Sequence, residues 1–216
     1  MMRSQRPQSG FTLIEVMVVI AILSLLITAL WPSISRALGA SEETETQARM
    51  MELRAAIEEF QREYGFYPSD DFQNFGDEIE IKAKPDGVNS GVESLVMFLC
   101  WKPNARMDLT DNEDWLDNTD GDENSVEIPG LQRTAKMEVV DAWGTPFAYF
   151  TSQNYTKQQQ IRLGGDGAGD DVIAKAYKNP NGKGFVGPRK FQLISAGPDR
   201  EFNTEDDLVY PAVPRD

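Results

Sequence analysis

The sequence contains no histidine and a single cysteine among its 216 residues. Without histidine, the chain has no Ser-His-Asp or Cys-His catalytic pair, and no metal site can include a histidine ligand. Cys100 cannot form an intramolecular disulfide, and it lies in the apolar stretch 95–101, so we interpret it as a small buried hydrophobic residue. Because nothing in the sequence joins a nucleophile to a base, we do not expect an enzyme.

Positive charge is also scarce in this chain. There are 21 lysine and arginine residues against 35 aspartate and glutamate residues, which gives a formal net charge of −14. Such a surface repels phosphate groups, so nucleic acid is not expected as a partner. An acidic surface suits a protein that binds divalent cations or one that simply stays soluble. With 40% hydrophobic residues, the composition suits one membrane anchor and one modest globular domain.

A long apolar run dominates the N-terminal region. It extends from Phe11 to Trp31 and contains Glu15 as its one charged residue. Roughly 20 helical residues match a hydrocarbon core of about 30 Å, so the run predicts a transmembrane helix. A carboxylate inside such a helix is unfavourable and usually has a partner, so Glu15 should have one.

The residues ahead of the run form a short basic leader. Residues 1–10 contain Arg3 and Arg6 and no acid, which predicts that the N-terminus stays in the cytoplasm. A secretory signal peptide would place a small-residue cleavage site after the apolar run, but no such site follows Trp31. The small residue is instead Gly10, which directly precedes the run.

The junction Gly10-Phe11-Thr12-Leu13-Ile14-Glu15 resembles the class III signal of type IV pilins and type II secretion pseudopilins. The resemblance implies that a prepilin peptidase cuts between Gly10 and Phe11 and that Phe11 is then N-methylated. It also implies that Glu15 pairs with the terminal ammonium of a neighbouring subunit, which would satisfy the buried acid. The alternative is that Glu15 only sits near the headgroups, where the helix dipole favours it.

Beyond the apolar run, the pattern predicts that the helix continues to Tyr64, with a bend at Pro32. Apolar residues recur at steps of three and four, which is typical of an amphipathic helix. Glutamate and arginine four residues apart predict exposed ion pairs, and Gly65 supplies the stop. The apolar stripe consists of Met50, Leu53, Ile57, Phe60 and Tyr64, and the expected pairs are Glu45 with Arg49 and Glu58 with Arg62.

Four later stretches resemble pseudopilins of the G type, namely 66–69, 91–99, 139–150 and 193–208. The apolar density of 91–99 predicts a short buried helix, and residues 190–195 predict a short strand. The expected fold is therefore α+β and pilin-like, with the long helix packed on a small antiparallel sheet. The expected parts are a leader at 1–10, a transmembrane helix at 11–38, an amphipathic half at 39–65 and a periplasmic domain at 66–216. Insertions that match nothing in the family fall at about 102–136 and 151–189.

Two polar loops lie inside these insertions. The acidic stretch 111–124 can be aligned with an EF-hand through Asp120, Gly121 and Glu127, but Leu116 falls where the first aspartate should be. We interpret it as a solvated insertion, with weak cation binding as the alternative. The glycine-rich stretch 164–171 is interpreted as a mobile loop.

The last feature is the acidic stretch from Ser195 to Leu208, which resembles the calcium loop of the G-type pseudopilins. The resemblance implies Ca²⁺ as a cofactor, and turns at 197–198 and 203–204 would bring the acids together. Arg200 and Phe202 depart from the glycine-rich family pattern, and the alternative is an acidic surface turn without a metal. The implied ligands are the carboxylates of Asp199, Asp206 and Asp207, with main-chain carbonyls from Leu193 and Ser195.

The resulting hypothesis is a structural subunit of a type II secretion pseudopilus, anchored in the inner membrane with its C-terminal domain in the periplasm. The expected partners are prepilin peptidase, further copies of the chain and other pseudopilins, the inner-membrane secretion platform and membrane lipid. One alternative is a type IV pilus or competence pilin, although one cysteine excludes the C-terminal disulfide loop of many such pilins. Another is a membrane-tethered, calcium-dependent binding module that never assembles.

Overall fold

The structure is a computed structural model that describes residues 11–72, 87–101, 113–128, 133–164 and 169–214. The chain divides into two compact units, residues 1–41 and 42–216. Gly10 and the rest of the leader lie outside the described residues. The α+β class expected from the sequence is confirmed, because one long helix is followed by a second helix and several antiparallel strands.

The long helix α1 runs from Leu13 to Tyr64 and includes Pro32 in its interior. Within the first unit its large apolar side chains are exposed along the whole length of the run, from Phe11 to Leu38. Among the described residues, α1 is the helix that is long and apolar enough to cross a membrane. The helix ends where the sequence predicted, since Gly65 has a φ of +82° and its N–H donates to the carbonyl of Gln61.

The second half of α1 buries the predicted apolar stripe. Met50, Leu53, Ile57 and Phe60 are buried, and Tyr64 packs partly buried against the same cluster. The ion pair between Glu45 and Arg49 is present. The predicted pair of Glu58 with Arg62 is not formed in the described structure, because Glu58 instead accepts hydrogen bonds from Arg54 and Tyr210. Tyr210 lies far along the chain, so local spacing could not reveal it.

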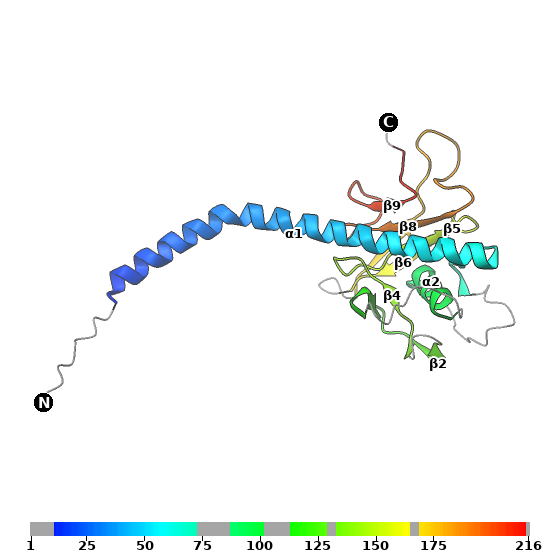
Figure 1. The fold of residues 1–216 in the computed structure, drawn as a ribbon, viewed down its shortest axis with the longest axis horizontal. Coiled ribbons are helices and arrows are strands. Elements are labelled where there is room, and N and C mark those ends of the chain that lie inside the picture. Colours follow the sequence, from blue (N-terminus) through cyan, green and yellow to red (C-terminus); the bar gives the residue numbers. More distant parts are fainter. Residues whose placement is uncertain (1–10, 73–86, 102–112, 129–132, 165–168, 215–216) are drawn as a thin grey trace, which may run out of the picture. The chain divides into compact units, whose positions relative to one another are not determined.

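Helix α2 runs from Ser90 to Trp101 and covers the stretch for which a short buried helix was predicted. It packs against α1 and against strands β4 (Glu138–Val139) and β5 (Ala148–Thr151), in the core of the second unit (Figure 1). Gly91 allows this close approach, since a Cβ at this position would lie 2.6 Å from the backbone oxygen of Tyr149. Cys100 lies in α2 and packs partly buried against the core, as expected for a small hydrophobic residue.

The main sheet has three antiparallel strands in the order β5, β8, β9. Strand β8 is central and fully buried because it pairs with both neighbours and carries an apolar sequence. Phe191 and Leu193 of β8 join the core cluster that contains the α1 stripe, while Ile194 belongs to a second cluster. The strands are Ala148–Thr151 (β5), Phe191–Ser195 (β8) and Leu208–Tyr210 (β9).

The described parts of the two insertions contain regular structure that the sequence did not predict. The first insertion contributes a short 3-10 helix η2 (Glu113–Trp115) and the strands β1 (Leu116–Asp117), β2 (Glu123–Ile128) and β3 (Arg133–Ala135). The second contributes β6 (Gln158–Arg162) and β7 (Asp171–Lys175). Strand β1 pairs with β4 (Glu138–Val139), β2 with β3 and β6 with β7, and all three pairs are antiparallel. Residues 165–168 of the glycine-rich stretch lie outside the described residues, and Asp171 begins strand β7.

Candidate functional site

The start of α1 is held by reciprocal hydrogen bonds between Thr12 and Glu15. The Glu15 Oε2 atom accepts bonds from the backbone N–H and the hydroxyl of Thr12, both at 2.8 Å. The N–H of Glu15 donates to the Thr12 hydroxyl at 3.3 Å. This is a capping box, in which a threonine and a glutamate three residues later satisfy donors at a helix N-terminus.

Sequence reasoning did not single out Thr12, although the spacing Thr-x-x-Glu is a recognised signal for a capping box. In the structure, Glu15 therefore caps the helix of its own chain. This is close to the alternative in which the N-terminus of the helix favours the acid without a neighbouring subunit. One carboxylate oxygen carries both bonds to Thr12, so Oε1 takes no part in the capping box. Phe11, the predicted new N-terminus, is highly exposed at 87%.

The C-terminal acidic loop connects β8 to β9 and closes on itself. The N–H of Asp199 donates to the Asp206 Oδ2 atom at 3.2 Å, so the two ends of the loop meet. Gly197 makes this possible because its φ is +70° and a Cβ there would lie 2.6 Å from the backbone oxygen of Asp206 and 3.1 Å from its Oδ2. The loop thus forms a cradle that any side chain at 197 would fill.

Asp206 and Asp207 occupy different environments although they are adjacent. The Thr204 hydroxyl donates to Asp206 Oδ1 at 2.6 Å, and this bond holds the pKa of that carboxyl below its usual value. Asp207 Oδ2 accepts bonds from the Tyr177 hydroxyl at 2.7 Å and from the N–H of Asn203 at 2.8 Å. Burial raises the pKa of Asp207 against these bonds. Asp206 is the more readily ionised of the two.

Leu193 and Ser195, the predicted carbonyl ligands, lie in the central strand β8 just before the loop. Ser195 is buried, and its hydroxyl donates to Asp141 Oδ2 at 2.6 Å. Asp141 also accepts the N–H groups of Trp143 and Thr145 through Oδ1, so it closes the turn between β4 and β5. The structure brings Ser195 to the base of the loop and joins it to a buried carboxylate that sequence reasoning had not connected with it.

The two residues that depart from the family pattern attach the loop to the rest of the unit. Arg200 donates to the hydroxyl of Thr145 and to the carbonyl of Gly164. Phe202 is buried in the second core cluster. These contacts anchor the middle of the acidic segment, between Asp199 and Asp206, to the rest of the unit.

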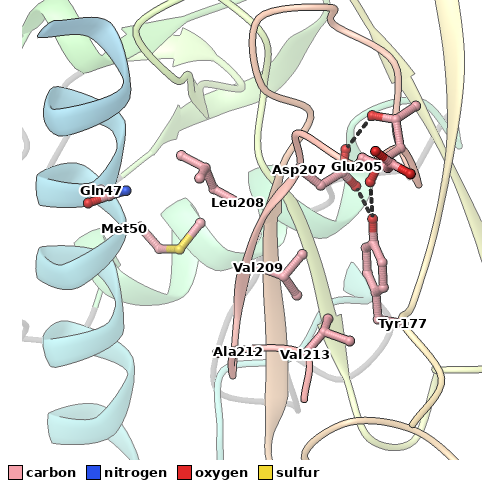
Figure 2. Close-up of a pocket in the computed structure, with 10 residues that line it drawn as sticks. Gln47, Met50, Tyr177, Glu205, Asp207, Leu208, Val209, Ala212 and Val213 are labelled. Carbon is pink, nitrogen blue, oxygen red and sulfur yellow. Dashed lines mark hydrogen bonds between the residues drawn. The ribbon is translucent and has the colours of Figure 1, made fainter. Parts of the chain in front are cut away.

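A pocket of about 550 Å³ lies between this loop and the second half of α1. Figure 2 shows Glu205, Asp207 and Tyr177 gathered on one side of it, with the apolar side chains of Met50, Leu208 and Val209 along the remainder. The loop therefore presents carboxylates beside an apolar surface.

A second acidic group lies at α2, away from the loop. Glu93, Asp120 and Asp122 place carboxylate oxygens within 4.8 Å of one another, which is the spacing of metal ligands among the described residues. Lys136 is buried with them and forms ion pairs with Asp122 and with Glu93. A protein ammonium thus lies among these carboxylates. The acidic stretch that contains Asp120 is partly packed against the domain rather than fully solvated, while Glu127 of the EF-hand alignment is exposed in β2.

Known proteins match this chain both at its N-terminal region and along most of its length. The family model of the prokaryotic N-terminal methylation motif matches residues 5–31. Type II secretion system core protein G of Escherichia coli is 26% identical over 212 residues, covering 96% of this chain and 94% of that protein. The protein of the same name from Pseudomonas aeruginosa is 26% identical over 163 residues, covering 76% and 87%. No solved structure matches the chain.

A methylation motif that leads directly into a helix of membrane-spanning length, followed by an α+β domain, is the organisation expected from the resemblance to the prepilin-like class. Within that class, the similarity to core protein G extends over most of the chain, well beyond the shared N-terminal motif. Over most of its length, the chain is thus similar to the pseudopilins of the type II secretion system.

Proposed function

We propose that this chain is a structural subunit of a type II secretion pseudopilus and that it polymerises through its N-terminal helix to support protein secretion. One observation carries the proposal: the methylation motif begins a membrane-length helix in a chain that aligns almost end to end with core protein G. The role is structural and needs no catalytic group. The basic leader stays in the cytoplasm and the C-terminal domain is periplasmic before assembly.

In this proposal, prepilin peptidase cuts after Gly10 and leaves Phe11 as a methylated N-terminus. The cut creates a new positive charge at the level of the membrane, where Glu15 of a neighbouring subunit needs one. Intact-mass measurement of the membrane-extracted protein tests this, with a peptidase-deficient host as the control. A mature chain that keeps residues 1–10 in a host with active peptidase would contradict the proposal.

The capping box makes it necessary to separate two roles of Glu15. Glu15→Val removes both the charge and the cap, whereas Glu15→Gln keeps an acceptor that can cap the helix. If the charge pairs with a neighbouring N-terminus, both variants should be processed and inserted but should form no fibres. If capping is the whole role, Glu15→Gln should assemble normally and Thr12→Val should fail. Fibre formation by Glu15→Gln would remove the charge-pairing part of the proposal.

We also propose that the C-terminal loop binds Ca²⁺. The cradle at Gly197 and the meeting of Asp199 with Asp206 support this, because calcium prefers several hard oxygen ligands. The ion would neutralise the clustered acids and crosslink the two ends of the loop. The residues that would hold it are the carboxylates of Asp199, Asp206 and Asp207, with the carbonyls of Leu193 and Ser195.

The calcium proposal predicts a change in thermal stability of the full chain in detergent. A cation that binds only the folded form raises the melting temperature, and magnesium should do so less because it needs a tight octahedral shell. Asp206→Ala combined with Asp207→Ala should abolish the shift, while Glu201→Ala, an exposed acid of the same loop, should keep it. A melting temperature that does not respond to calcium would show that the loop is an acidic turn without a metal.

A further inference from the structure

One segment of this acidic chain is strongly basic. Residues 172–198 contain five lysine and arginine residues and no acid. The rest of the chain then has 16 basic residues against all 35 acidic ones. The five cations are Lys175, Lys178, Lys183, Arg189 and Lys190, and all five are exposed.

Three of these five cations have no partner within the described part of the domain. Among the described residues, the side chains of Lys178, Lys183 and Arg189 make neither an ion pair nor a hydrogen bond. Lys190 acts electrostatically on Glu58 of α1. Positive charge that no internal acid neutralises is available to a partner.

The loop that carries these cations is an ordered part of the domain. Lys178 bridges Phe185 across a turn, and the Phe185 ring packs 5.2 Å from the ring of Tyr155. The buried side chain of Gln192 donates to the carbonyls of Tyr177 and Val186, which fixes both sides of the turn. The loop, coloured gold to orange, extends beyond β5 and β8 in Figure 1. The cations are thus presented on a fixed frame, which lowers the entropy lost on binding.

The partner that fits this surface is acidic, and the second unit offers such a surface itself. Glu45, Glu52 and Glu59 recur every seven residues along α1, so they lie on one side of the helix about 10 Å apart. Glu45 also pairs with Arg49 of its own helix, which leaves Glu52 at the centre of this acidic side. Glu52 is exposed and its carboxylate has no internal partner among the described residues. Copies that carry so much negative charge repel one another unless positive charge lies between them.

We propose that the basic loop 175–190 binds the acidic side of α1, at Glu45, Glu52 and Glu59, in a second copy of this chain. Because the two surfaces are different parts of the chain, the contact is heterologous and can repeat along a fibre. The inference rests on the proposed function in that the fibre supplies the second copy. It adds which surfaces of the globular parts meet.

Zero-length coupling of amines to carboxylates tests the contact in the full-length protein in its membrane. The ¹⁴N-labelled and ¹⁵N-labelled chains are produced in separate cultures, mixed in detergent and reconstituted together into membrane before coupling, so a mixed-isotope peptide proves that the link joins two copies. We expect mixed-isotope links between Lys178 or Lys183 and the α1 peptide that contains Glu52. Links confined to single copies, or none from this loop, would overturn the inference.

Charge reversal gives a second, independent measurement. Lys178→Glu combined with Lys183→Glu should reduce fibre yield roughly tenfold or more, because like charges at an interface strongly disfavour association. Lys157→Glu, at an exposed cation outside the segment that lies 3.6 Å from a carboxylate oxygen of Asp71, is a single-charge control and should lower the yield far less than the double variant. Normal fibres from the double variant would overturn the contact and leave the pseudopilus proposal standing. Absence of fibres from the unmodified, processed chain would instead overturn the pseudopilus proposal, while the mixed-isotope links would still decide the contact.

Discussion

Asn89 shows how much of the second unit can depend on one side chain. It is fully buried, stands directly before α2 and has a φ of +49°, a conformation that asparagine tolerates better than most residues. Its amide nitrogen donates to Thr119 at 2.8 Å and to Glu138 at 3.1 Å, and its oxygen accepts from the N–H of Arg162 at 2.9 Å. One residue therefore connects α2, the loop before β2, β4 and β6.

Replacing Asn89 with alanine should destabilise the domain by roughly 3–5 kcal/mol, because several buried donors and acceptors lose their partner and each loss amounts to about 1–3 kcal/mol. Asn181→Ala, at an exposed asparagine, is the control and should change stability by less than about 0.5 kcal/mol. Denaturant unfolding of the full chain in detergent, followed by near-UV circular dichroism, measures both. Equal stability of the two variants would contradict the role assigned to Asn89.

At the scale of elements, α1 is one continuous helix whose two parts suit different surroundings. Its first part exposes apolar side chains on all sides, as a helix in lipid requires. Its second part is amphipathic and contributes one stripe to the domain core. The turn between β4 and β5 attaches to the same part, since Trp143 donates to Glu42 and the N–H of Ala142 donates to Thr46. The globular fold therefore includes the second half of α1 as a core element.

Ile57→Ala should accordingly destabilise the domain by about 2–5 kcal/mol, since the side chain is fully buried and its removal leaves a cavity. Met51→Ala, on the same helix and 66% exposed, should have an effect within about 0.5 kcal/mol. Urea unfolding in detergent compares the two variants. A small effect at Ile57 would mean that the domain core forms without α1.

For the whole molecule, buried carboxyl groups should make stability depend on pH. Glu138 is buried between Asn89 and Thr119, and burial raises its pKa from 4.5 to about 8, with Asp120 adding to the rise. Burial also raises the pKa of Asp141. The folded state therefore binds protons that the unfolded chain releases, and this contribution to stability is complete below pH 4.5 and is lost as the pH rises through 8.

We expect Glu138→Gln to reduce the fall in unfolding free energy between pH 5 and 8, because glutamine keeps the shape of the protonated acid and cannot ionise. One pKa unit corresponds to about 1.4 kcal/mol, so the difference should be measurable over this range. Asp171→Asn, at a carboxyl whose pKa is lowered by Arg162, is the control and should leave the slope nearly unchanged between pH 5 and 8. Identical slopes for Glu138→Gln and the unmodified chain would contradict the prediction.

The sequence predicted those features whose physical basis is local. The membrane-length run, the amphipathic stripe, the stop at Gly65, helix α2 and strand β8 each follow from a short stretch of residues, and the structure confirms them. The strands in the insertions were not predicted, because they are short and polar and form only by pairing. Strand β6, for example, begins with three glutamines and gains its partner from β7.

At the candidate sites, the sequence by itself determined the N-terminal methylation motif, the helix of membrane-spanning length and the identity of the acids in the C-terminal loop. These depend on residue type and spacing along a few turns of chain. The capping of α1 by Thr12 and Glu15 is also local, since the spacing Thr-x-x-Glu signals it. Only the tertiary structure decided that Ser195 bonds to Asp141 and that Gly197 allows Asp199 to reach Asp206. These two contacts form only after the strands pair and the loop folds back, and their energies depend on burial, which a short stretch of sequence does not specify.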